Sequence, residues 1–205
     1  MLSWLLLGRR CRDCREPISA RYPLVEAGTA LAFALVALAT GPSWVLPAYL
    51  YGAAIAIALT LIDIETHRLP NVIVLGSYPV VVALLAVAAW GTGDWGSLVR
   101  ALLGGAALFA FYLLLVIVYP AGMGLGDVKL AAIIGAYLAS VGWGTLVVGG
   151  FAGFLLGGIF SVVLVGARSA GRKTAIPFGP WMLLGAVVGM VFGERVWDAY
   201  LSTFM

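Results

Sequence analysis

Two isolated aspartates are the residues of this chain whose type and placement could do chemistry. Asp63 stands in the run LIDIETHRLPN and Asp127 in the run GMGLGDVKL, each at the boundary of a long apolar segment. A carboxylate at such a boundary is costly unless it serves a purpose. Two carboxylates held close together cannot both ionise easily, so one keeps a proton, which is the minimum equipment of an aspartyl protease. The pair therefore predicts peptide hydrolysis, provided that the two residues can meet.

Glycines lead into the second aspartate. Gly122, Gly124 and Gly126 remove side chains from the stretch before Asp127, so a substrate strand could approach the backbone closely. A GxGD sequence alone is weak support, because 27 of the 205 residues are glycine. A structural alternative is a glycine-rich turn in which Asp127 caps a helix beginning at Val128, and capping does not exclude catalysis.

Composition decides the class of protein. The chain is 63% hydrophobic and 10% charged, against roughly 45–50% and about 25% in soluble domains. We therefore expect an all-α polytopic membrane protein, in which a spanning helix needs about 20 apolar residues. About seven transmembrane helices are predicted, of which the fifth is short, at residues 24–40, 44–62, 72–90, 98–119, 128–138, 141–165 and 176–192. Residues 1–22 form a short cytoplasmic N-terminal segment, and residues 23–205 form one transmembrane domain.

The basic residues predict the orientation. With the N-terminus in the cytoplasm, only Arg100 and Arg195 of the twelve Lys and Arg residues fall on the far side, together with the C-terminus. This skew follows the positive-inside rule. The net charge of +3 then reflects topology and an attraction to anionic lipid, and it does not indicate nucleic-acid binding.

The same topology places the two aspartates. Two spans, 72–90 and 98–119, separate Asp63 from Asp127, and two crossings return the chain to the side that it left. Both carboxylates are therefore expected at the cytoplasmic face, at the ends of helices that can be neighbours.

Several motifs resemble those of a known family. The run GLGDVKL resembles the GGGDxKL signature of type IV prepilin peptidases, and LIDIETHRLPN is similar to their other signature, an Asp before a hydrophobic-Pro-Asp/Asn tripeptide. The segment SWLLLGRRCRDCREPISARYPLVE and the run IPFGP at 176–180 also look like family elements. By this match the catalytic acids are Asp63, not Glu65, and Asp127.

The resemblance implies a substrate and a location. Prepilins or pseudopilins, of type IV pili or type II secretion, carry a short basic leader before an apolar helix. The leader would be removed at the cytoplasmic face of the bacterial inner membrane, typically after a glycine. Proteolysis of this kind requires no cofactor, and the resemblance leaves the oligomeric state open.

The cysteines depart from the family pattern. Many members carry two CxxC pairs that together can bind a metal, whereas this chain has only Cys11 and Cys14. An upstream helix and the first pair are expected to be missing. Two thiolates do not complete a tetrahedral zinc site, so zinc would need other ligands or a second chain, and a plain scaffold is the alternative. S-adenosylmethionine-dependent methylation of the new N-terminus, the family's second activity, is also left open.

Other polar residues receive supporting roles. Besides Gly124 and Gly126, Lys129 is expected either to bind the substrate backbone or to extend to the lipid headgroups. Glu26, just inside the first span, is expected either to make a structural hydrogen bond or to support the site. Pro177 to Pro180 predicts a broken helix entry that could pack against the site. Outside the site, Asp94, Glu194 and Asp198 are interpreted as solvated residues on the far side.

Two other functions compete with leader removal. An intramembrane GxGD protease of the signal-peptide-peptidase type would pair GLGD with a Tyr-Asp inside a span and a Pro-Ala-Leu element, and neither is present here. A small non-enzymatic transporter would need polar residues near the middle of its spans. The spans of this chain are almost purely apolar.

Overall fold

The fold is a bundle of helices. The computed structural model describes residues 10–120, 123–166 and 177–204. These residues form seven helices and no strand beyond an isolated bridge between Arg10 and Pro17, which confirms the all-α prediction. The helices are α2 (Arg21–Thr40), α3 (Leu46–Thr66), α4 (Asn71–Thr92), α5 (Trp95–Val118), α6 (Leu125–Val141), α7 (Trp143–Gly166) and α8 (Gly179–Phe204).

Each predicted apolar run overlaps one of these helices, but the runs and helices do not end together. Helices α2, α3, α4, α5 and α7 are long and apolar enough to cross a membrane, so the chain is a polytopic membrane protein. Helix α6 has only 17 residues, a length of about 26 Å against roughly 30 Å for the hydrocarbon core. Helix α8 continues to Phe204, beyond the predicted end at 192, because helical hydrogen bonding does not stop where the apolar run stops.

Helix α6 forms the centre of the bundle. It packs against α4, α5, α7 and α8, and more than half of its residues are buried, from Val128 to Ala139. Small residues allow the close approach: a Cβ on Gly135 would collide with the backbone of Gly104 in α5. The Tyr137 hydroxyl donates a 2.8 Å hydrogen bond to the carbonyl of Ala48 in α3. The glycine and alanine content that makes this run a weak span therefore suits it to the core.

Helices α7 and α8 pack along facing glycines. Gly149 and Gly153 recur every fourth residue on α7, as do Gly185 and Gly189 on α8. A Cβ added at Gly189 would lie 2.5 Å from the Cα of Gly149, and one at Gly185 would meet the backbone of Gly153. Small residues at this spacing let two membrane helices approach backbone to backbone. The helix pair therefore depends on the absence of side chains along this seam.

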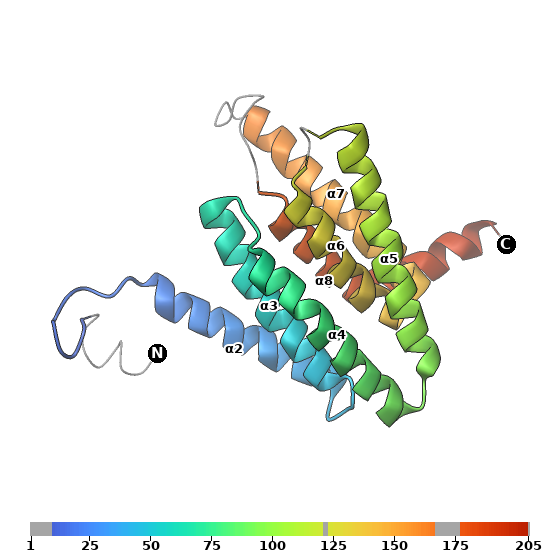
Figure 1. Ribbon diagram of the computed structural model, residues 1–205, viewed down its shortest axis with the longest axis horizontal. Coiled ribbons are helices and arrows are strands. Elements are labelled where there is room, and N and C mark those ends of the chain that lie inside the picture. The colour runs from blue at the N-terminus through green and yellow to red at the C-terminus, as the bar shows by residue number, and fades with distance from the viewer. Residues whose placement is uncertain (1–9, 121–122, 167–176, 205) are drawn as a thin grey trace.

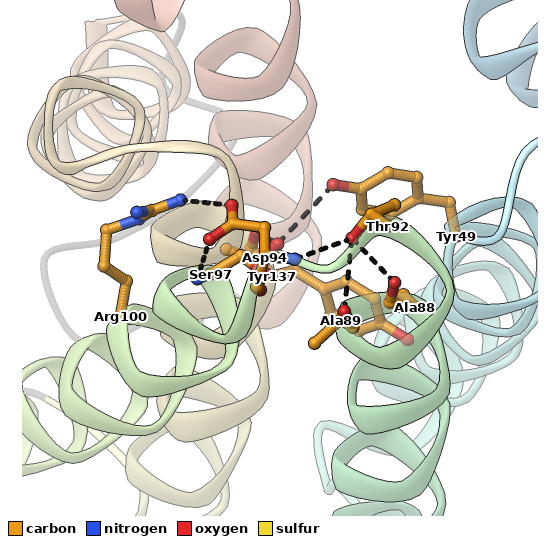
Figure 2. A network of polar contacts seen from close by, with 9 residues as sticks. Tyr49, Ala88, Ala89, Thr92, Asp94, Ser97, Arg100 and Tyr137 are labelled. Carbon is orange, nitrogen blue, oxygen red and sulfur yellow. Dashed lines mark hydrogen bonds and ion pairs between the residues drawn. The ribbon is translucent and has the colours of Figure 1, made fainter.

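Two acidic residues at the far end, Asp94 and Glu194, are exposed, as predicted, and each also accepts hydrogen bonds at a helix start. Asp94 caps α5 by accepting a 3.0 Å hydrogen bond from the Ser97 N–H, and it pairs with Arg100, as Figure 2 shows. Glu194 of α8 accepts from both the backbone N–H and the hydroxyl of Thr145, at 3.1 and 2.9 Å. This carboxylate therefore caps the first turn of α7, which begins after the side-chain-free Gly142.

The chain brings the ends of several helices together at one end of the bundle. Figure 1 shows the end of α3 and the starts of α4, α6 and α8 gathered there. The connections from α2 to α3 and from α4 to α5 lie at the opposite end. Asp63 and Asp127 therefore share one end of the bundle, as the even number of intervening helices requires.

Candidate active site

Asp63 lies in the last turn of α3 and is buried. The residue is 4% exposed, and its Oδ2 accepts a 3.1 Å hydrogen bond from the backbone N–H of Gly179, the first residue of α8. Neighbouring Glu65 is exposed and forms an ion pair with Arg21. Of the two acids in this turn, Asp63 is thus the one enclosed by other helices.

Asp127 is the third residue of α6 and is partly buried. Its carboxylate accepts a 3.2 Å hydrogen bond from the Gly124 N–H, and its own N–H donates to the Gly124 carbonyl at 3.1 Å. The helix begins at Leu125 and not at Val128 as the capping alternative supposed. Asp127 does cap its helix, and this leaves its second oxygen for other partners.

The structure brings the two carboxylates into the same site. Among the described residues neither carboxylate makes a hydrogen bond to the other, and each lies beside a glycine that packs against Leu69, Gly179 beside Asp63 and Gly126 before Asp127. Leu69, in the connection after α3, lies between the two helix starts: a Cβ on Gly126 would be 3.1 Å from Leu69 Cβ, and one on Gly179 3.7 Å from Leu69 Cδ2. The connection from α3 to α4, which follows Asp63, therefore packs against Gly126, the residue before Asp127.

Of the predicted supporting residues, Lys129 contacts a neighbouring helix, whereas Glu26 is exposed on α2. The Nζ of Lys129 donates a 2.8 Å hydrogen bond to Oδ1 of Asn71, and its carbonyl accepts from the Tyr78 hydroxyl at 2.8 Å. Lys129 thus ties the start of α6 to α4. Glu26 is exposed on α2, which packs against α3 at the edge of the bundle. Its supporting role stays a prediction.

Three residues of the site were not singled out from the sequence. The IPFGP run was noted, but its Gly179 was not recognised as the partner of Asp63, and no pattern indicated Leu69. Tyr112 of α5 was also missed: it is 1% exposed and contacts the ring of Phe178, the residue before Gly179. A tyrosine in an apolar span carries no sequence signal that separates a site residue from a core residue.

Cys11 and Cys14 lie in a tight turn before α2. The Arg15 N–H donates to the Cys11 carbonyl at 3.1 Å, and the Cys11 N–H donates to the Glu16 carbonyl at 2.9 Å. Hydrogen bonds from the backbone of Cys14, and then of Asp13, lower the pKa of the Cys11 thiol. No group of three or more metal-binding side chains occurs within the described part of the chain. Two thiols do not fill a structural zinc site, which takes four ligands.

This arrangement can carry out hydrolysis of an amide. Two carboxylates in one partly enclosed site can divide the roles of base and acid, with water as the nucleophile. The site lies at the end of the bundle where α3 ends and α4, α6 and α8 begin.

Comparisons with known proteins identify relatives along the whole chain. Residues 50–162 match the Type IV leader peptidase family, and residues 1–40 match the Bacterial Peptidase A24 N-terminal domain. A prepilin leader peptidase/N-methyltransferase of Aeromonas salmonicida is 36% identical over 221 residues, covering 100% of this chain and 69% of the relative. The protein of that name from Pseudomonas aeruginosa is 34% identical, with 98% and 69% covered. No solved structure matches.

Proposed function

The chain belongs to the type IV leader peptidase family, and we propose from this premise that it is a membrane-embedded aspartyl endopeptidase. Its substrates are type IV prepilins or pseudopilins, from which it removes the short basic leader. The observation that carries this proposal is the placement of Asp63 and Asp127 at one end of the bundle, each accepting a hydrogen bond from a glycine N–H.

The proposed mechanism uses the two carboxylates as a coupled pair. The charged member takes a proton from a water molecule, which attacks the scissile carbonyl carbon. The protonated member donates a hydrogen bond to the carbonyl oxygen and later supplies a proton to the departing amine. The pair titrates as a unit, so the two roles are not assigned to single residues.

The position of the site suits a leader peptide. A prepilin has a soluble basic leader joined to an inserted apolar helix, and the junction lies at the membrane surface. The basic residues described at the site end of the bundle, including Arg21, Arg68 and Lys129, support a cytoplasmic location in the inner membrane by the positive-inside rule. A leader made on the cytoplasmic side would then meet the carboxylates directly.

The decisive experiment replaces each acid by its amide. Asp63→Asn and Asp127→Asn should each abolish cleavage of a prepilin in detergent or liposomes, since neither amide can act as base or share a proton. Glu65→Gln is the matched control, because Glu65 lies two residues from Asp63 but pairs with Arg21 outside the site. It should cleave normally. Substantial cleavage by either Asp variant would refute the pair.

The same assay addresses cofactors. Proteolysis by two carboxylates needs none, so chelators should leave cleavage unchanged. The relatives are also named as N-methyltransferases. Product mass after incubation with S-adenosylmethionine shows whether this chain adds a methyl group to the new N-terminus.

A further inference from the structure

The start of α8 holds the carboxylate of Asp63. Gly179 lies 116 residues further along the chain, and its N–H reaches Asp63 Oδ2 in a buried hydrogen bond of 3.1 Å. Among the described interactions, Oδ1 accepts no hydrogen bond. One oxygen of Asp63 is therefore held by the backbone at the start of α8.

The sequence of this helix start directs one donor at the carboxylate. The N–H groups of Trp181 and Met182 both donate to the Phe178 carbonyl, at 3.1 and 3.2 Å. Pro180 has no N–H. The Gly179 N–H is thus the donor of this turn that points at Asp63. The positive end of the helix dipole adds to its attraction for a carboxylate.

Space makes glycine necessary at this position. A Cβ on residue 179 would lie 2.7 Å from Asp63 Oδ2, closer than a carbon and an oxygen can approach without displacement. Any other residue would push the carboxylate away from the N–H that holds it. The need for glycine here comes from the acid and not from the backbone angle.

Aromatic packing holds Phe178, the residue before Gly179, in place. The ring of Phe178 contacts the rings of Tyr112 and Phe154, with centroids 6.4 and 5.4 Å apart. Gly157 of α7 leaves room for it: a Cβ there would be 2.9 Å from Phe178 Cε2. Helices α5 and α7 therefore set the position of Phe178, and through it the position of the Gly179 N–H.

We propose that Phe178 and Gly179 are positioning residues for the catalytic carboxylate of Asp63, the ring placing the amide and the amide fixing Oδ2. This inference rests on the proposed function, because it assumes that Asp63 acts on the substrate. It extends that function to the two residues at the entry of α8, neither of which bears an ionisable side chain.

Two substitutions test the proposed roles of the Gly179 N–H and of the Phe178 ring. Gly179→Ala displaces the carboxylate directly. Gly157→Ala displaces the Phe178 ring without touching Asp63. Loss of one hydrogen bond to a charged group should lower kcat by roughly 10- to 100-fold, with KM for a prepilin nearly unchanged because leader binding is not altered. Gly158→Ala is the matched control: it adds the same methyl group one residue away, where a Cβ meets nothing within 4 Å.

The outcomes separate the inference from the proposed function. Wild-type kcat in Gly179→Ala, with Asp63→Asn inactive, would overturn the positioning role and leave the peptidase intact. Normal cleavage by Asp63→Asn would refute the proposed function itself. If Gly179→Ala fails to accumulate in the membrane, Gly157→Ala decides. A larger fall in kcat for Gly157→Ala than for Gly158→Ala supports the positioning role of Phe178, and equal kcat values for these two variants overturn it.

Discussion

At the scale of single residues, the two glycines of the GLGD run have different tasks. Gly124 supplies the N–H that binds Asp127, and its backbone angles are ones that any residue adopts, with φ −82° and ψ 152°. A Cβ there would lie 3.6 Å from Asp127 Oδ2, an ordinary contact. Gly126 faces Leu69, where a Cβ would be 3.1 Å from another Cβ. Gly126 should therefore tolerate substitution less well than Gly124.

This difference predicts the outcome of one substitution at each position. Gly124→Ala keeps its N–H and should cleave within about twofold of the wild type, like other substitutions that meet no close neighbour. Gly126→Val would force Leu69 and the start of α6 apart, an overpacking worth about 1–3 kcal/mol, and should lower kcat roughly tenfold or more. Prepilin cleavage rates normalised to inserted enzyme measure both. Equal sensitivity of the two positions would contradict this assignment.

The sequence singled out the candidate residues that are marked by local pattern, and their catalytic role stays a prediction. Asp127 stands in a glycine run, and the motif around Asp63 favoured it over Glu65, which the structure places in an ion pair with Arg21. The partner of Asp63 could not be predicted in the same way. Gly179 is joined to it by a contact across 116 residues, and such a contact depends on how the helices pack, not on any local pattern.

At the scale of the helices, hydropathy predicted where the chain is helical but not how the helices pack. A segment in lipid must satisfy its own backbone hydrogen bonds, so an apolar run of sufficient length becomes a helix. The run 128–138 is the shortest of the predicted spans, yet α6 packs against four other helices, α4, α5, α7 and α8. Its length marks this run as a weak span, whereas its small residues permit the close packing against the neighbouring helices.

The glycine seam between α7 and α8 gives a prediction at this scale. Gly185→Val would place a side chain against the backbone of Gly153, which cannot yield without separating the helices. We expect a loss of about 1–3 kcal/mol or more in stability, seen as a lower unfolding temperature in detergent. Gly158→Val on the exposed face of α7 is the control and should leave that temperature nearly unchanged. Similar unfolding temperatures for both variants would show that the seam does not hold the pair.

At the scale of the whole molecule, the even number of helices between Asp63 and Asp127 decides that they share one end (Figure 1). That feature follows from counting crossings and does not depend on details of packing. Which end faces the cytoplasm depends instead on the distribution of charge. The basic turn around Cys11 and Cys14 lies before α2, and α2 begins at Arg21 with the ion pair to Glu65 of α3. The two cysteines therefore report on the side of the membrane that bears the site.

Thiol labelling tests this orientation. Cys11 and Cys14 are the only cysteines of the chain, and the lowered pKa of the Cys11 thiol favours the reactive thiolate. A membrane-impermeant maleimide should label inside-out vesicles and leave intact spheroplasts unlabelled. In a Cys11→Ser, Cys14→Ser background, Ser202→Cys near the end of α8 should show the opposite pattern, because three helices, α6, α7 and α8, run from Asp127 to this position. Labelling of the native cysteines from outside would place the carboxylates on the far side, where a cytoplasmic leader could not reach them.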